Sequence, residues 1–117
     1  MNATGLHTPP IYWAGVALGP AAWAVNTQTI YAMTPHACGS TGLSTIILPI
    51  VLMLVAAAGT AISARAIRRV PTAEWLDAQG GRAKHFMAWV GCAAGVLFAL
   101  VIADQLAATL MIDPCLR

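Results

Sequence analysis

The chain has 117 residues, of which 59% are hydrophobic and only 9% are charged, and its formal net charge is +2. Soluble domains usually carry about 25% charged residues, so this composition excludes an ordinary soluble enzyme and predicts a membrane protein. The small net charge also excludes a basic surface for nucleic acid. We expect a single membrane domain over residues 1–117, without a secretory signal, because the first ten residues contain no Lys or Arg.

Three stretches are apolar enough to cross a bilayer, which takes about 20 residues in a helix. They are residues 11–33, 43–67 and 85–111. The predicted fold is therefore an all-α membrane protein with three transmembrane helices. A short loop joins the first two helices, and a second loop, residues 70–84, contains a turn that Gly80 and Gly81 are expected to end.

Basic residues are concentrated around the connection between the second and third stretches. They are Arg65, Arg68, Arg69, Arg82 and Lys84, whereas residues 34–42 contain none. By the positive-inside rule, we expect this connection and the N-terminus in the cytoplasm, and the C-terminus in the periplasm. The predicted location is the bacterial inner membrane, crossed more than once.

The predicted orientation separates the three cysteines. Cys38 lies in the short outer loop and Cys115 in the outer tail, so both face the oxidising side. We predict a Cys38–Cys115 disulfide, because one pair on one side needs no further partner. The alternatives are two free thiols, or metal ligands together with His36. Cys92, within the third stretch, should be a reduced packing residue.

Small residues recur at helical spacing in all three stretches and favour close helix packing. Five residues of the first stretch share one face at about 100° per residue: Gly15, Gly19, Ala22, Asn26 and Thr29. Gly59 belongs to a small-residue tract of the second stretch, and Gly91 and Gly95 repeat the spacing in the third. We predict that these glycines lie at helix contacts.

Asp104 is an acid inside the apolar third stretch, where an ionisable group costs about 2.5–3.5 kcal/mol on insertion scales. Asn26 and Asp104 each lie seven residues from the outer end of their stretch, which is about 10 Å below the outer boundary. Gln28 and Gln105 lie near the same depth. Three roles are open for Asp104: a hydrogen bond to Asn26 inside the bundle, docking against another subunit, and proton transfer. The third is disfavoured, since no second acid, Lys or His shares this depth.

The sequence offers no haem or metal site and no catalytic site of its own. His7, His36 and His85 lie in tails, loops or helix boundaries, whereas haem ligation inside a bundle needs histidines that face one another. His36 with Cys38 gives too few ligands for a structural metal, and no nucleophile has a positioned base. We therefore expect a protein that is not an enzyme.

The segment Gly19-Pro20-Ala21-Ala22-Trp23, followed by Tyr31 and Pro35-His36-Ala37-Cys38, resembles small three-span membrane proteins encoded near haem–copper terminal (cytochrome c) oxidase subunits in proteobacteria. The likeness covers about Gly15 to Cys38. It implies an accessory or assembly subunit of a respiratory cytochrome oxidase in the electron transport chain. Haem and copper would then belong to partner subunits, and this chain would bind no cofactor.

The leading hypothesis is a non-catalytic accessory subunit that packs on other membrane subunits of a respiratory complex and contacts lipids. One alternative is a homo-oligomeric transporter or channel-like protein in which Asp104 lines a central path. Another is a redox chaperone that uses Cys38 and Cys115 for metal delivery.

Overall fold

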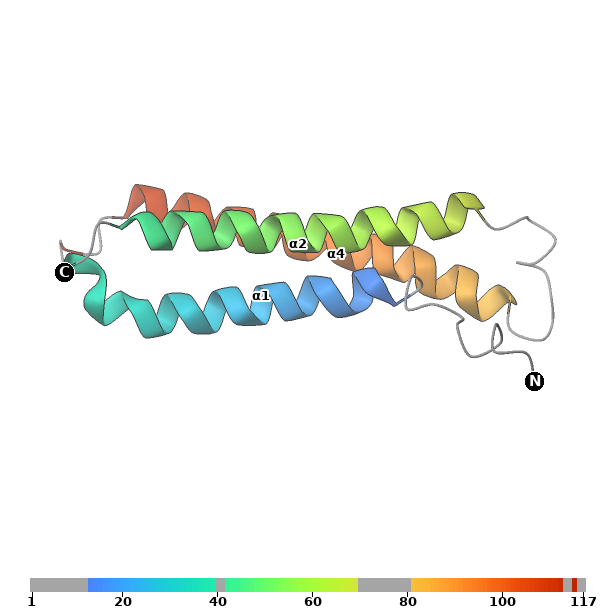
Figure 1. Ribbon diagram of the computed structural model, residues 1–117, viewed down its shortest axis with the longest axis horizontal. Coiled ribbons are helices and arrows are strands. Elements are labelled where there is room, and N and C mark those ends of the chain that lie inside the picture. Colours follow the sequence, from blue (N-terminus) through green and yellow to red (C-terminus); the bar gives the residue numbers. More distant parts are fainter. Residues whose placement is uncertain (1–12, 40–41, 70–80, 113–114, 116–117) are drawn as a thin grey trace.

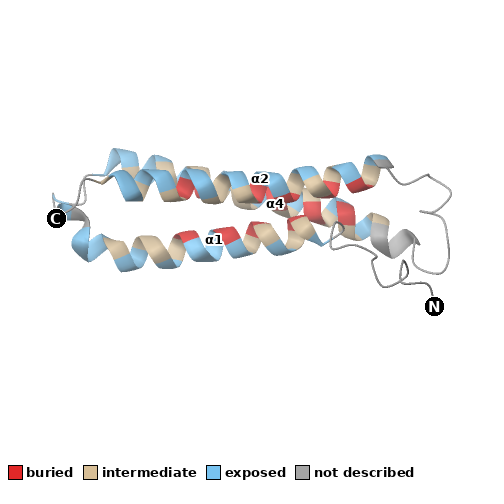
Figure 2. Ribbon diagram, in the orientation of Figure 1, coloured by how far each residue is buried: buried red, intermediate tan, exposed pale blue. Residues whose placement is uncertain are grey.

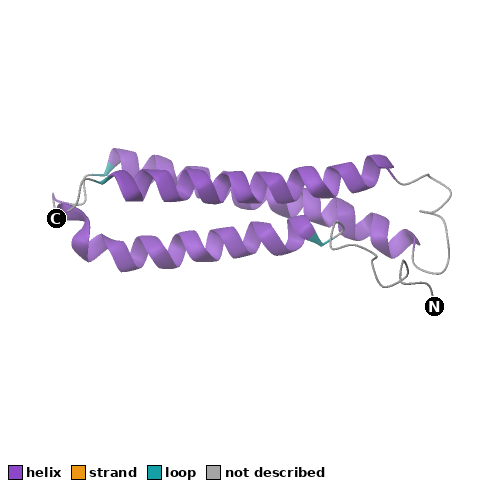
Figure 3. Ribbon diagram, in the orientation of Figure 1, coloured by secondary structure: helices purple, strands orange, loops and turns teal. Residues whose placement is uncertain are grey.

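The computed structural model describes residues 13–39, 42–69, 81–112 and 115, and all structural statements concern these ranges (Figure 1). Its elements are α1 (Ala14–Met33), the short 3₁₀ helix η3 (Thr34–Gly39), α2 (Leu43–Arg69) and α4 (Gly81–Met111). Within these ranges the chain contains helices and loops but no strand, as Figure 3 shows. The expectation of an all-α fold with three long helices is confirmed.

The three long helices lie side by side in an elongated bundle that measures 59 × 25 × 16 Å (Figure 1). Successive helices run in opposite directions, so α1 and α4 begin at the end where α2 finishes. We call this the basic end, because the last turns of α2 and the first turn of α4 carry the basic residues named above. The opposite end, with Met33, Leu43 and Met111, is the disulfide end.

Two of the helices contain segments long and apolar enough to cross a membrane. These are Leu43–Arg68 and His85–Met111, whose most apolar stretches of 18 residues have mean hydropathies of 2.4 and 2.3. Within these 18-residue stretches only 17% and 22% of the residues are buried inside the bundle, whereas the core helix of a soluble protein is mostly buried. α1 is less apolar because four polar residues follow one another at positions 26–29.

The helix boundaries differ from the expected ones mainly at the basic end. α2 continues to Arg69, two residues beyond the predicted limit, and α4 begins at Gly81, four residues before it. Gly81 is therefore the first residue of α4, where the backbone N–H group needs no intrahelical acceptor. The turn expected before it lies within residues 70–80, outside the described residues, so its end at Gly80 and Gly81 stays a prediction.

Small side chains dominate the interior of the bundle. Apart from Ile102, the buried residues are glycine, alanine, serine, asparagine or proline: Gly15, Gly19, Ala22, Asn26, Pro49, Ala56, Gly59, Ser63, Ala66, Ala88, Gly91 and Gly95. They line the inner faces of the helices, and most of them lie from the middle of the bundle towards the basic end, whereas Pro49 and Asn26 lie nearer the disulfide end (Figure 2). Large apolar side chains point outwards instead; Leu54 is 60% exposed and Leu100 is 63% exposed.

The three backbones meet at Gly15, Gly59 and Gly91. A Cβ atom added to Gly15 would clash with the carbonyl oxygen of Gly91 and lie 2.8 Å from its Cα. A Cβ atom on Gly59 would lie 3.0 Å from the carbonyl oxygen of Ala14. Any side chain at position 15 would push the backbone of α4 away, and Gly15, Gly59 and Gly91 all lie where two helices touch.

Ser63 of α2 completes this contact with a hydrogen bond. The backbone N–H of Gly15 donates to Ser63 Oγ at 3.1 Å, and the Ser63 side chain is fully buried. Gly15 lies in the first turn of α1, where N–H groups lack intrahelical acceptors and Trp13 supplies no side-chain cap. A residue of α2 therefore satisfies a donor that would otherwise be buried without a partner.

The two glycines of α1 make a matched test of this packing. We expect Gly15→Ala to lower the free energy of unfolding by about 1–3 kcal/mol, because backbone atoms of α4 must move. Gly19→Ala should change it by less than about 0.5 kcal/mol, since the nearest atoms to the new methyl lie at 3.4 Å. Equilibrium unfolding by SDS in mixed micelles measures both values. Equal effects of the two substitutions would contradict the close contact.

Candidate functional site

A buried polar contact joins α1 to α4 towards the disulfide end. Asn26 is fully buried, and its Nδ2 donates to Gln105 Oε1 at 2.7 Å. Gln105 Nε2 in turn donates to Thr27 Oγ1 at 3.3 Å. The two amides therefore bridge the helices and fix the rotation of α4 against α1.

The first of the three roles left open for Asp104, a hydrogen bond to Asn26, is not formed. Asn26 bonds to Gln105 instead. Asn26 and Asp104 share a depth but not a face of the bundle. The inward-facing positions of α4 can be read from the sequence: starting at Gly91 and Gly95, positions 91, 95, 98, 102 and 105 follow one another at intervals of four, three, four and three residues. Extending that spacing from the glycines leads to Gln105.

Asp104 lies on the exposed, outward face of α4. It is two residues from the fully buried Ile102, which places the two side chains about 160° apart around the helix. No hydrogen bond or ion pair within the described ranges engages its carboxyl group. The acid is therefore presented to whatever surrounds the bundle.

Apolar side chains surround Asp104 on this outward face, which we call the α4 outer face. Its exposed members, at intervals of three or four residues, are Phe86, Trp89, Ala93, Leu97, Leu100, Asp104, Ala107 and Met111. The face runs the length of the helix and carries a single ionisable group near the disulfide end. Such a face suits an apolar neighbour that offers one polar partner.

The remaining polar residues of α1 are spread over different faces. Gln28 is exposed, so the structure does not bring it to Asn26. The hydroxyl groups of Thr27 and Thr29 donate back to the carbonyl oxygens of Trp23 at 2.9 Å and Val25 at 2.7 Å. Asn26 Oδ1 is buried and has no hydrogen-bond partner in the part of the chain that the structure describes.

A disulfide joins Cys38 to Cys115, as predicted. The two Cα atoms lie 5.6 Å apart across a sequence separation of 77 residues, a distance usual for such bonds. The bond ties η3 to the residue just beyond α4 and so closes the disulfide end. Cys92 is free and half-buried, with its Sγ 3.8 Å from the carbonyl oxygen of Thr60.

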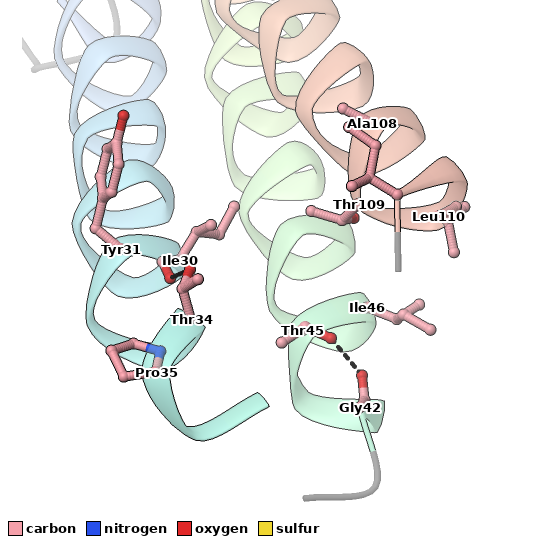
Figure 4. A pocket seen from close by; sticks show the side chains of 11 residues that line it. Ile30, Tyr31, Thr34, Pro35, Gly42, Thr45, Ile46, Ala108, Thr109 and Leu110 are labelled. Carbon is pink, nitrogen blue, oxygen red and sulfur yellow. Dashed lines mark hydrogen bonds between the residues drawn. The ribbon is translucent and has the colours of Figure 1, made fainter. Parts of the chain in front are cut away.

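A cavity of about 680 Å³ opens between the three helices at the disulfide end (Figure 4). Its walls are the last turn of α1, the first turn of α2 and the last turn of α4. Ile30, Ile46 and Ala108 are representative wall residues, one from each helix. Nothing in the sequence analysis identified this cavity, because it depends on how far the helix ends splay apart.

The histidines do not combine into a ligand set within the described ranges. His36 is exposed in η3, and Trp89 Nε1 donates to His85 Nε2 at 2.9 Å near the basic end. No three His, Cys, Asp or Glu side chains of the described residues gather closely enough to hold a metal. His7 lies outside those residues.

Comparison of the sequence with protein-family profiles, with characterised proteins and with solved structures gave no match.

The Asn26–Gln105 contact can be measured by a double-mutant cycle. We expect Asn26→Leu and Gln105→Leu each to destabilise the bundle, because each leaves the other amide without its partner between the helices. The double variant should lose less than the sum of the single losses, with a coupling energy of about 0.6–1.7 kcal/mol in SDS unfolding. Additive losses would contradict a direct bond.

The disulfide can be tested by mass mapping and by its contribution to the free energy of unfolding. Mass mapping of alkylated, unreduced protein should find Cys38 joined to Cys115 and Cys92 alkylated. Replacing both bonded cysteines by serine should lower the free energy of unfolding by about 2–4 kcal/mol, because the long loop is no longer closed. If both thiols are alkylated in the native membrane protein, the bond does not form there and metal delivery by these cysteines gains support.

Proposed function

We propose that this protein is a non-catalytic accessory subunit of an inner-membrane complex, docked through the α4 outer face. The observation that carries the proposal is the position of Asp104, an acid on the outward surface of an apolar helix.

Three membrane spans are supported by length and by hydrogen bonding. α2 and α4 are long and apolar enough, and α1, with 20 residues, reaches about 30 Å, the thickness of the hydrocarbon core. α1 contains no charged residue. Its polar groups are mostly satisfied inside the protein, since Asn26 pairs with Gln105 and two threonines bond to their own helix. A helix with these properties is acceptable in a bilayer.

The positions of charge and disulfide support one orientation. Arg65 and Arg68 are exposed near the end of α2, so the basic end belongs on the cytoplasmic side. The Cys38–Cys115 bond lies at the opposite end, and disulfides persist on the periplasmic side. Both features support an orientation with the N-terminus in the cytoplasm and the C-terminus in the periplasm of a bacterial inner membrane.

Docking follows from the energetic cost of the exposed acid. A carboxyl group in the membrane, about 10 Å from the end of α4, costs several kcal/mol unless a partner or water solvates it. Since the described residues of α1 and α2 leave Asp104 exposed, the proposed partner is a second protein. It would be an apolar helix that carries a hydrogen-bond donor or a cation at the same depth.

A respiratory terminal oxidase is the complex that we propose. The support is the resemblance of the segment from Gly19 to Cys38 to small proteins encoded near haem–copper oxidase subunits. In that assignment the oxidase subunits hold haem and copper. This chain covers a flank of the core and stabilises it by helix packing.

The second candidate is a homo-oligomer in which several α4 outer faces surround a central path lined by Asp104. The same exposed position of Asp104 favours it. In that arrangement the acids of neighbouring copies solvate one another through water, and the protein conducts protons or small solutes.

Substitution of Asp104 separates docking from conduction. We expect Asp104→Asn to reduce the co-purifying subunits about tenfold or more, because a hydrogen bond to an ionised group contributes about 1.5–3 kcal/mol. Affinity purification from native membranes, with subunit identification and a haem spectrum, measures the loss. Gln28→Leu is the matched control, since it removes an exposed amide from α1 at a similar depth.

Each outcome decides between the candidates. Loss of a cytochrome with Asp104→Asn but not with Gln28→Leu supports docking through the α4 outer face. Unchanged co-purification, together with abolished proton leak in reconstituted vesicles, supports the homo-oligomer. A wild-type protein that purifies as a stable monomer, and never with a cytochrome, contradicts the accessory role.

A further inference from the structure

We infer that the cavity at the disulfide end is a binding site for one acyl chain of a phospholipid from the periplasmic leaflet. This inference rests on the proposed insertion of the bundle in a membrane, but not on the identity of its partner. Four observations carry it: the chemistry of the lining, the shape, the depth and the position of the disulfide.

The threonine hydroxyl groups in the cavity wall are turned back onto the backbone. Thr34 Oγ1 donates to the carbonyl oxygen of Ile30 at 2.7 Å, and Thr109 Oγ1 donates to that of Leu106 at 2.7 Å. Thr45 bonds in the same way to Gly42, as the dashed line in Figure 4 shows. Tyr31 contributes the remaining hydroxyl group of the wall. Most of the wall therefore offers an occupant apolar contact.

The shape of the cavity fits a chain better than a helix. On one wall the lining residues run from Ile30 of α1 to Pro35 of η3, and on another from Ala108 of α4 to Ile112 just beyond it. Each stretch is shorter than two helical turns. A partner helix, about 10–12 Å wide, would need a groove several turns long. The volume of about 680 Å³ is within the range of sites that enclose small molecules, about 300–1,000 Å³.

The depth of the cavity brings it within reach of acyl chains. Its walls are the last turns of α1 and α4 and the first turn of α2, so it lies at the boundary between the hydrocarbon and the headgroups of one leaflet. Figure 4 shows it open between α1 on one side and the α2–α4 pair on the other. An apolar cavity with a lateral opening at this depth is filled by lipid, and each buried CH₂ group contributes about 0.8 kcal/mol.

The disulfide links the two walls that enclose the chain. Pro35 and Ile112 line the cavity, and each stands three residues before a bonded cysteine, Cys38 and Cys115. The bond therefore holds the end of α1 to the end of α4 and keeps the walls from separating. Without this link the lipid site would widen towards the periplasm.

Two neighbouring alanines of α4 allow a matched test. Both are exposed, but Ala108 lines the cavity, whereas Ala107 lies outside it on the α4 outer face. The wild type, reconstituted in vesicles of palmitoyl-oleoyl phosphatidylglycerol and re-extracted in mild detergent, should retain one phospholipid in native mass spectrometry. Ala108→Phe should lose at least 80% of the lipid-bound species, because the ring occupies the cavity, and Ala107→Phe should keep it.

A second pair of variants, on α2, tests the inference independently in case the Ala108→Phe variant does not fold. Ile46 lines the cavity and Ile47 is an exposed neighbour outside it. Ile46→Trp should lose the lipid and Ile47→Trp should retain it. Equal retention by both members of each pair, or a wild type that holds no lipid, overturns the inference.

The readouts separate this inference from the proposed function. If Asp104→Asn keeps the bound phospholipid and no cytochrome ever co-purifies, the lipid site stands and the accessory role fails. If the isolated wild type holds no lipid and Ala108→Phe instead releases a co-purifying subunit, a protein side chain occupies the cavity and the lipid site is wrong.

Discussion

The close approach of three backbones at Gly15, Gly59 and Gly91 is the constraint on which the rest of the structure depends. Without side chains at these positions, Ser63 can reach the first turn of α1 and accept the hydrogen bond of Gly15. The helices are therefore held at the basic end by packing and by one buried bond. Towards the other end the Asn26–Gln105 contact sets their rotation, and the Cys38–Cys115 bond closes them.

The small size of the interior side chains determines which residues form the surface of the bundle. Because the core is filled by small residues, large apolar side chains such as Leu54 and Leu100 face outwards, where lipid or other subunits must cover them. The rotation fixed by Gln105 also turns Asp104 to the outside. The bundle thus directs one amide pair inwards and presents one acid on its outer surface, and this arrangement is the basis of the proposed association with a neighbour.

Much of the fold followed from local patterns in the sequence. The lengths of the apolar stretches predicted the three long helices, and the spacing of the glycines predicted the helix contacts at Gly15 and Gly91. The positive-inside rule predicted that Cys38 and Cys115 lie at the same end and can form a disulfide. The exposed position of Asp104 could not be predicted from the sequence. Depth alone cannot distinguish Asp104 from Gln105, because adjacent residues of a helix share a depth but point about 100° apart. The cavity was also beyond reach of the sequence, since it arises from the separation of helix ends and not from any run of residues.

The most direct test of the central claim is photocrosslinking from defined faces of the bundle in native membranes. A photoreactive amino acid would replace Ala107 on the α4 outer face, or Val25 of α1 and Val51 of α2, which are exposed on the other helices. Docking through the α4 outer face predicts a protein adduct from position 107, which Asp104→Asn abolishes, and adducts with lipid from the other two positions. Protein adducts of equal yield from all three faces, or none from position 107, would contradict it.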